Sequence, residues 1–288
     1  MIFSVIIVSY ENLNILIDCV ESIEKYNDIG DELEVIVVDN STTNTVFDYV
    51  RSNYSKIKIV KNRNRGFGEG NNVGAKMAKG EYLLFLNPDT ILVEPIFEFA
   101  TGKFRESMEL AMFGVKLVDI NMKQNMSFYY MDNSGTIYSQ LVKLFNYFGV
   151  FLEGKMFVSG ANMFIRRDVF FEAGMFDENI FMYYEEADIT RRIIKINKKI
   201  RYFGDRKIIH LEGKTSGNSE KALERRIESL NYYCEKYNVD FDRRIRSEIR
   251  YTNLKRIVYL ITRNGKIDTI CRSLSILKEY RDRTAGQH

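Results

Sequence analysis

Short runs of apolar residues alternate with segments of helical periodicity in the first part of the chain. Val5–Val8 and Leu33–Val38 are mainly apolar, β-branched runs typical of buried strands, and apolar positions within Leu13–Ile23 recur at helical spacing. The pattern continues with a strand at Ile57–Val60, the opening of a helix at Gly70–Ala78 and a strand at Tyr82–Leu86. Strands that alternate with helices predict an α/β fold, with a mostly parallel central sheet flanked by helices.

A different pattern follows residue 218. Three apolar stripes at helical spacing predict amphipathic helices over Leu223–Tyr237, Leu254–Ile261 and Ile267–Leu277, with a break at Gly265. We therefore expect a sheet-containing domain at residues 1–218 and a helical extension at residues 219–288.

The predicted extension has two interpretations. The stripes pack against the rest of the chain or against a second subunit in a homodimer, or they attach to an anionic membrane surface through basic neighbours. Those neighbours are Arg250, Lys255, Arg256, Arg263, Lys266 and Arg272.

Charge is unevenly distributed, although the formal net charge is only +3. Residues 219–288 hold 16 Lys/Arg against 10 Asp/Glu, which leaves 26 against 29 for residues 1–218. The basic tail contains neither a recognisable groove-reading motif nor a platform of stacking aromatic residues, so nucleic acid is not an expected partner.

The cysteines and the apolar runs bear on cellular location. Cys19, Cys234 and Cys271 are far apart and form no CxxC pair, which fits reduced thiols in a cytosolic protein. No run approaches the roughly 18 apolar residues that span a bilayer. We expect a cytoplasmic protein, at most peripheral on the cytoplasmic face of the inner membrane.

Polar residues follow each predicted strand, where open α/β sheets bind their ligands. These sets are Ser9-Tyr10-Glu11, Asp39-Asn40-Ser41, Asn64-Arg65-Gly66 and Asn87-Pro88-Asp89-Thr90. The Asp39 carboxylate could accept hydrogen bonds from the base or ribose of a nucleotide, or it could cap the next helix.

The segment from Asn64 to Asn72 places three glycines ahead of a helix. Glycines allow close approach of a ligand to the backbone, and a helix N-terminus favours phosphate. The spacing differs from the dinucleotide-binding fingerprint, and a simple turn is the other interpretation.

Asp89 and His210 are candidate metal ligands. After a buried strand, the Asp89 carboxylate could join a divalent cation to a pyrophosphate, or it could cap a helix near Ile91. His210 follows an apolar stretch and could complete the metal site with its imidazole, or serve a structural role.

Three carboxylates, Glu185, Glu186 and Asp188, lie at the start of a predicted helix. They could simply complement the helix dipole. In the functional interpretation, one of them has a raised pKa beside the aromatic residues of the preceding loop and takes a proton from an acceptor hydroxyl. Asp188 would then be an orienting or capping partner in this group of carboxylates.

Taken in order, these segments resemble the family 2 glycosyltransferases of the GT-A fold, especially bacterial rhamnosyltransferase-like members. The resemblance covers residue 1 to about residue 216. It is carried by Ser4-Val5-Ile6-Ile7-Val8-Ser9-Tyr10, Val37-Val38-Asp39-Asn40-Ser41, Asn64-Arg65-Gly66-Phe67-Gly68-Glu69-Gly70-Asn71-Asn72-Val73-Gly74, Leu86-Asn87-Pro88-Asp89-Thr90, Ser159-Gly160-Ala161, Gly174-Met175-Phe176-Asp177-Glu178, Glu185-Glu186-Ala187-Asp188 and His210-Leu211-Glu212-Gly213.

The resemblance implies a GT-A nucleotide-diphospho-sugar transferase fold with a donor site and a Mn²⁺ or Mg²⁺ ion on Asp89 and His210. Asn87 stands where the family's Asp-x-Asp motif has its first Asp, which leaves one carboxylate ligand. The donor residues expected are Ser9, Tyr10, Glu11, Asp39, Asn64, Gly66, Gly68, Asn71, Asn72 and Asn87.

The family's base is the second residue of a Glu-Asp pair, so the resemblance places Glu186 in that role with Glu185 as its rival. It implies inverting transfer from a dTDP-, UDP- or GDP-sugar, dTDP-rhamnose among them. The acceptor would be a hydroxyl of a glycan or polyprenyl-linked glycan in bacterial surface polysaccharide synthesis. A sugar-nucleotide nucleotidyltransferase and a non-catalytic glycan-binding relative are the alternatives.

Overall fold

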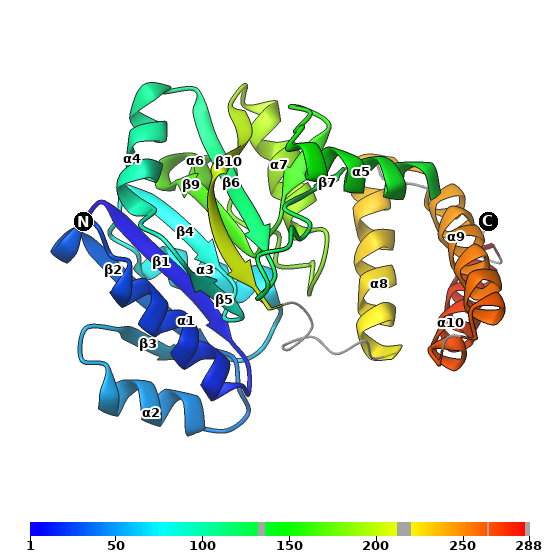
Figure 1. The fold of residues 1–288 in the computed structure, drawn as a ribbon, viewed down its shortest axis with the longest axis horizontal. Coiled ribbons are helices and arrows are strands. Elements are labelled where there is room, and N and C mark those ends of the chain that lie inside the picture. The colour runs from blue at the N-terminus through cyan, green and yellow to red at the C-terminus, as the bar shows by residue number, and fades with distance from the viewer. Residues whose placement is uncertain (132–135, 212–219, 264, 286–288) are drawn as a thin grey trace.

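An eight-stranded, mostly parallel sheet forms the centre of the computed structural model, which describes residues 1–131, 136–211, 220–263 and 265–285 (Figure 1). Its order is β3-β2-β1-β4-β9-β6-β10-β5. The strands are β1 (Phe3–Ser9), β2 (Leu33–Asp39), β3 (Lys58–Lys61), β4 (Tyr82–Leu86), β5 (Thr90–Leu92), β6 (Leu110–Val118), β9 (Asn162–Arg166) and β10 (Lys199–His210). Only β9 and β5 run antiparallel to their neighbours, so the predicted α/β sheet is confirmed.

Helices cover both faces of the sheet. One apolar cluster holds residues of α1 (Leu13–Lys25), α2 (Thr45–Asn53) and α4 (Phe97–Glu106). The other holds residues of α3 (Phe67–Met77), α6 (Arg167–Glu172) and α7 (Glu185–Lys195). The short helix η1 (Gly30–Glu32) precedes β2.

Strand β1 shows how the sequence pattern produces this layering. Val5 and Ile7 belong to the cluster under α1, whereas Ile6 between them belongs to the cluster under α3. Successive side chains of a strand point to opposite faces, so a continuous apolar run marks a strand buried on both sides.

Two local predictions need correction. Helix α3 begins at Phe67, earlier than the expected opening at Gly70, because the preceding Gly66 has φ 123° and ends the loop. Asp89 does not cap a helix near Ile91, because Thr90–Leu92 forms strand β5 and pairs with Ile208–His210.

A two-stranded antiparallel sheet joins the main body to the tail. It consists of β7 (Phe128–Tyr130) and β8 (Met156–Val158), and α5 (Thr136–Phe148) packs beside β7. Helix α5 also contacts the second helix of the tail, so this unit links the two parts.

The tail forms three helices beside the sheet: α8 (Glu220–Tyr237), α9 (Phe241–Ile261) and α10 (Ile267–Ala285) (Figure 1). They share a small core of Ile227, Ile245, Ile249, Leu274 and Leu277. The predicted break at Gly265 falls between α9 and α10.

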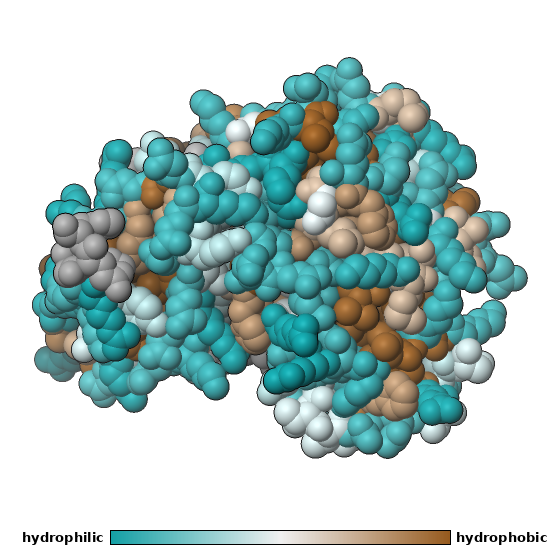
Figure 2. Space-filling view, turned by 180° about the vertical axis from the view of Figure 1, so that it is seen from behind, coloured by the Kyte–Doolittle hydropathy of each residue, from teal (hydrophilic) through white to brown (hydrophobic). Residues whose placement is uncertain are grey.

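The apolar stripe at the end of α9 is not packed against the core. Leu254, Ile257, Val258 and Ile261 are 49%, 49%, 53% and 77% exposed. Within the described ranges, no helix is long and apolar enough to cross a membrane. Seen from behind, hydrophilic side chains cover most of the tail, with apolar ones showing between them (Figure 2).

Two helical glycines give a matched test of the packing. A Cβ atom at Gly74 in α3 would overlap the Ile6 side chain of β1, whereas one at Gly102 in α4 would meet nothing within 4 Å. We expect Gly74→Ala to lower the free energy of unfolding by about 1–3 kcal/mol through overpacking. Gly102→Ala should raise it by about 0.5–1 kcal/mol by removing a flexible helix residue. Urea unfolding measures both, and equal effects would contradict the tight α3–β1 contact.

Candidate active site

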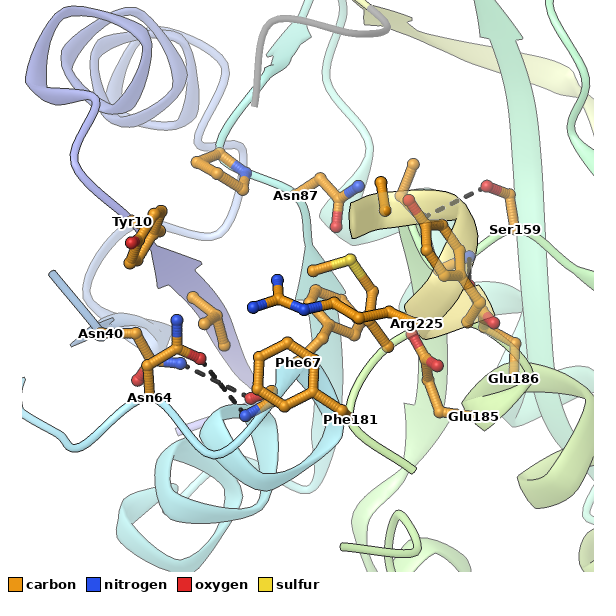
Figure 3. Close-up of a pocket in the computed structure, with 18 of the residues that line it drawn as sticks. Tyr10, Asn40, Asn64, Phe67, Asn87, Ser159, Phe181, Glu185, Glu186 and Arg225 are labelled. Atoms are coloured by element: carbon orange, nitrogen blue, oxygen red, sulfur yellow. Dashed lines mark hydrogen bonds between the residues drawn. The ribbon is translucent and has the colours of Figure 1, made fainter. Parts of the chain in front are cut away.

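A cavity of about 350 Å³ lies at the carboxyl ends of β1, β2 and β4 (Figure 3). Parallel strands end at this edge, so loops distant in sequence meet here. Its lining is drawn from seven parts of the chain: Val8 and Tyr10; Asn40; Asn64, Gly66 and Phe67; Asn87 and Pro88; Ser159 to Ala161; the segment that leads into α7, with Glu185 and Glu186; and the first turns of α8.

Gly66 joins the two sides of the cavity. Its Cβ atom would overlap the Phe181 carbonyl group, and the N–H of Phe67 donates a hydrogen bond of 2.8 Å to that carbonyl oxygen. Glycine is therefore required for the approach of one protein loop to another. Asn64 supports this turn by accepting a hydrogen bond from the N–H of Gly66 at 3.3 Å.

The backbone is strained immediately before the carboxylates. Tyr183 and Tyr184 have φ values of 70° and 72°, a left-handed conformation that costs bulky residues roughly 1–3 kcal/mol each. Contacts with α8 hold the turn: the Tyr184 ring lies 5.3 Å from that of Tyr233, and the Ser229 hydroxyl donates to the Met182 carbonyl oxygen at 2.8 Å. Helix α7 starts directly after this turn, which aims its first residues at the cavity.

Glu185 and Glu186 both line the cavity but differ in surroundings. Glu185 is 3% exposed, and among the described residues its Oε2 atom has no hydrogen-bond partner. Glu186 is partly exposed, and its Oε1 accepts a hydrogen bond of 3.2 Å from the N–H of Gly160. A Cβ atom at Gly160 would lie 2.5 Å from that same oxygen, so a larger residue there would displace the carboxylate from its present position.

Burial raises the pKa of both carboxyl groups. The Glu185 pKa lies well above its usual 4.5, first because of burial and then because of the adjacent Glu186 charge. Burial also raises the Glu186 pKa, against backbone hydrogen bonds that lower it. Because the two carboxyl groups are adjacent, the charge of one opposes ionisation of the other.

Asp89 and His210 are brought together by strand pairing. His210 is opposite Thr90 in the β5–β10 ladder, and the N–H of Leu211 donates to the Asp89 carbonyl oxygen at 2.9 Å. As a result, Asp89 Oδ1 lies 3.3 Å from His210 Nε2. Neither side chain lines the cavity itself, whereas Asn87, two residues before Asp89, does.

This pair fits a divalent cation that keeps other ligands. Two ligands at right angles on a cation with bonds of 2.0–2.1 Å would be about 3 Å apart, close to the observed spacing. The buried Asn87 Oδ1 has no hydrogen-bond partner among the described residues and offers another oxygen. No group of three or more His, Cys, Asp or Glu side chains in the described ranges could hold a metal, so water or phosphate would have to complete the set.

Four of the expected donor residues, Tyr10, Asn64, Gly66 and Asn87, line the cavity, but Asp39 does not. Asp39 is fully buried, accepts a hydrogen bond from the N–H of Ser41 at 2.9 Å and pairs with the Lys61 ammonium at 3.0 Å. It does not cap the next helix either, since α2 begins after Asn44.

Ser9 and Glu11 also lie outside the cavity lining. Ser9 is fully buried at the end of β1. Glu11 accepts hydrogen bonds of 2.6 Å from the Thr42 N–H and hydroxyl, which lower its pKa. These residues therefore shape the loops behind the cavity.

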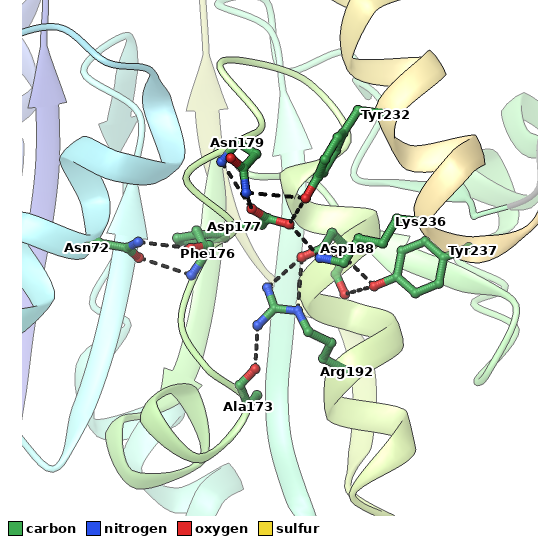
Figure 4. Close-up of polar contacts among 10 residues, drawn as sticks. All are labelled: Asn72, Ala173, Phe176, Asp177, Asn179, Asp188, Arg192, Tyr232, Lys236 and Tyr237. Carbon is green, nitrogen blue, oxygen red and sulfur yellow. Dashed lines mark hydrogen bonds and ion pairs between the residues drawn. The ribbon is translucent and has the colours of Figure 1, made fainter.

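Gly68, Asn71 and Asn72, also among the expected donor residues, do not line the cavity and make contacts within the protein. Asn72 exchanges two hydrogen bonds with the backbone of Phe176, at 2.9 and 3.0 Å (Figure 4). Asn71 donates to the Phe67 carbonyl oxygen at 3.0 Å, and a Cβ atom at Gly68 would lie 3.0 Å from Phe176 Cβ. Buried amides satisfy backbone groups that water cannot reach.

Asp188, expected as an orienting or capping partner, does not line the cavity. Its buried carboxylate pairs with Arg192 at 2.5 Å, with Lys236 at 2.6 Å and with the Tyr237 hydroxyl at 2.7 Å (Figure 4). Lys236 also pairs with Asp177 at 2.6 Å. This cluster fixes α7 against α8.

The sequence interpretation missed two cations on α8. Lys221 and Arg225 line the cavity, and the Arg225 guanidinium lies 4.3 Å from the centre of the Phe181 ring (Figure 3). Their i, i+4 spacing places them on one helix face, but no sequence signal showed which part of the protein that face meets.

Relatives share this fold and parts of the sequence. Chondroitin synthase of Escherichia coli is 25% identical over 111 residues, which cover 38% of this chain and 16% of that protein. Among solved structures, Staphylococcus aureus TarS in complex with UDP-GlcNAc has a TM-score of 0.61 at 19% identity, covering 97% of this chain and 80% of that one. Mannosyltransferase PcManGT from Pyrobaculum calidifontis, in complex with GDP-Man and Mn²⁺, has a TM-score of 0.57 at 14% identity. The match covers 81% of this chain and 64% of that one.

The structural likenesses confirm the expected GT-A fold, since both TM-scores exceed 0.5. The sequence match to chondroitin synthase covers only a small part of that protein's length. The model of the protein family described as "Glycosyl transferase family 2" matches residues 4–172, more than half of the chain. The chain therefore belongs to glycosyltransferase family 2.

Proposed function

We propose that this protein transfers a sugar from a nucleotide diphosphate donor to an acceptor hydroxyl, with inversion at the anomeric carbon. One observation carries the proposal: Tyr10, Asn87 and Glu186, from three distant segments, line a single cavity at the carboxyl edge of the sheet. The cavity combines a ring for a base, polar groups for a sugar and a carboxylate that can accept a proton.

The donor would lie along the side of the cavity formed by the first strands. Tyr10 is 48% exposed there and offers a stacking surface, and Asn40 and Asn64 offer amide groups. Lys221 and Arg225 provide positive charge for the diphosphate, which carries the growing negative charge as the glycosidic bond breaks.

Asp89 and His210 would hold Mn²⁺ or Mg²⁺, which supplies additional positive charge to the diphosphate when bound. The spacing of their donor atoms supports this assignment. So does the Mn²⁺ named with the structurally similar mannosyltransferase.

Glu186 is the proposed general base. The acceptor oxygen forms a bond to the anomeric carbon as its proton passes to the Glu186 carboxylate, and the bond to the diphosphate breaks with its electron pair on the leaving oxygen. Glu186 fits this role better than Glu185 because it is the more exposed of the two and accepts a backbone hydrogen bond, which favours its charged form. The N–H of Gly160 fixes its orientation.

The finer assignments remain part of this proposal. The donor is a dTDP-, UDP- or GDP-sugar, with dTDP-rhamnose drawn from the resemblance and UDP-GlcNAc and GDP-Man from the structural relatives. The acceptor is a glycan or polyprenyl-linked glycan of a bacterial surface polysaccharide, and the protein works in the cytoplasm, at most peripherally on the inner membrane. Residues 1–218 form the catalytic domain, extended by residues 219–288.

Conservative substitutions of the two glutamates should separate their roles. We expect Glu186→Gln to lower kcat by about 10²–10⁴-fold because the base is lost. Glu185→Gln should retain most turnover, because glutamine resembles the protonated acid. Transfer and donor hydrolysis with a panel of nucleotide sugars measure both variants, and the reverse order would make Glu185 the base. Release of pyrophosphate instead would identify a nucleotidyltransferase.

Asp89→Ala should abolish most turnover and the effect of the cation on donor binding. With Mn²⁺ present, the matching nucleotide sugar should raise the Tm of the wild type, by linkage of binding to folding. EDTA or Asp89→Ala should reduce that increase, whereas Asp39→Asn should leave its dependence on Mn²⁺ intact. A cation effect that survives in Asp89→Ala would exclude this carboxylate as a ligand.

The buried Glu185 should make stability depend on pH. Its pKa is higher in the folded than in the unfolded protein, so the folded state binds more protons and stability falls as pH rises above about 4.5. Glu185→Gln removes this dependence and should raise Tm by about 2–4 °C at pH 8, with little change at pH 4. Thermal unfolding at both pH values tests this, and a destabilised variant at pH 8 would contradict the assignment.

A further inference from the structure

Thr90 is fully buried at the start of β5, directly after the candidate metal ligand Asp89. It does not line the active-site cavity. Its side chain and its backbone nevertheless contact different neighbours, and both sets of contacts lead to the candidate metal site.

The side chain of Thr90 closes the turn that contains Asp89. Its hydroxyl donates a hydrogen bond of 2.7 Å to the carbonyl oxygen of Asn87, and its N–H donates to the same oxygen at 3.2 Å. Pro88, which lies between them, has a fixed φ and no N–H to donate. Two hydrogen bonds from one residue therefore hold the backbone on both sides of Asp89.

Strand pairing connects Thr90 to the second candidate ligand. Thr90 is opposite His210 in the β5–β10 ladder. The residue that fixes the backbone around Asp89 is thus paired with the residue whose Nε2 atom lies 3.3 Å from Asp89 Oδ1. Because the side chain of aspartate is short, a shift of the turn would change this spacing directly.

Helix α1 supports the same turn. The Cys19 Sγ atom lies 3.8 Å from the Asn87 carbonyl oxygen and 3.7 Å from the Thr90 hydroxyl oxygen. Burial raises the pKa of the Cys19 thiol to about 12, so the thiol keeps its proton and can donate it. The Ser22 hydroxyl accepts a hydrogen bond of 2.9 Å from the N–H of Leu92, which fixes β5 to the same helix.

We propose that Thr90 is a positioning residue for the divalent cation, because its hydroxyl and its place in the ladder set the spacing of Asp89 and His210. This inference rests on the metal site of the proposed function and names the residue on which the geometry of that site depends. Side chains that orient metal ligands typically account for about 10–100-fold in metal affinity.

The first experiment measures binding of Mn²⁺ alone to the full chain by electron paramagnetic resonance. Thr90→Val keeps a branched side chain and removes the hydroxyl. Thr101→Val is the matched control, because the buried Thr101 hydroxyl also donates to a backbone carbonyl oxygen, that of Phe97 at 2.8 Å, but within α4. The Kd for Mn²⁺ should rise about 10–100-fold in Thr90→Val and stay within about twofold of the wild type in Thr101→Val.

Thr90→Ser separates positioning from packing. Serine keeps the hydroxyl and loses only a methyl group, so the Kd for Mn²⁺ should return to within about threefold of the wild-type value. Equal losses of affinity in Thr90→Ser and Thr90→Val, or in Thr101→Val and Thr90→Val, would overturn the proposal. A wild type that binds no Mn²⁺ would overturn it as well.

Donor hydrolysis distinguishes this proposal from the proposed function. In Thr90→Val, the Mn²⁺ concentration for half-maximal hydrolysis of the matching nucleotide sugar should rise, whereas the rate at saturating Mn²⁺ should stay near that of the wild type. Excess cation refills a weakened site whose cavity residues are unchanged. A lower saturated rate with an unchanged half-maximal concentration would contradict positioning. A wild type without donor turnover would refute glycosyl transfer, whereas the Mn²⁺ titration would still report on Thr90.

Discussion

The buried carboxylate of Asp188 is the constraint on which the second half of the site depends. A charge without water is costly unless it is paired, and Arg192, Lys236 and Tyr237 together compensate it. Two of these partners belong to α8, so α8 has to dock against α7. This docking brings Lys221 and Arg225 to the cavity and supports the strained turn ahead of Glu185.

The sheet supplies the other half by topology. Strands β1, β2 and β4 are parallel and end at one edge, whereas β10 returns beside β5 in antiparallel register. The first arrangement gathers Tyr10, Asn40 and Asn87, and the second delivers His210 to Asp89. The proposed donor and metal sites are therefore neighbours because of strand order, not because of closeness in sequence.

Strands and helices could be predicted largely from the sequence because burial on one or two faces leaves a periodic pattern. Tyr82–Leu86 is a strand with the bounds expected. Individual roles were harder to predict, because a polar residue after a strand can face a ligand or satisfy the protein. Asn72, for example, donates a hydrogen bond to the Phe176 carbonyl oxygen, and Asp39 pairs with Lys61.

The cations of α8 could not be assigned from the sequence for a related reason. Periodicity shows that a helix has an apolar face, but not which surface meets its polar face. Contacts such as those of Ser229 with the Met182 carbonyl oxygen and of Lys236 with Asp188 fix that orientation. Glu185 and Glu186 could be singled out from the sequence because three carboxylates after an aromatic loop form an unusual local pattern, and both line the cavity.

The pairing of β10 with β5 has a consequence for hybrid proteins. The family match ends at residue 172, yet His210, Glu186 and α8 all come later in the chain. A chimera joined near residue 172 would receive its first-half loops from one parent and its edge strand, acidic pair and tail from the other. For such a chimera to keep the observed arrangement, the β10 strand of one parent would have to pair in the same register with the β5 strand of the other. Only that register places the His210 imidazole beside Asp89.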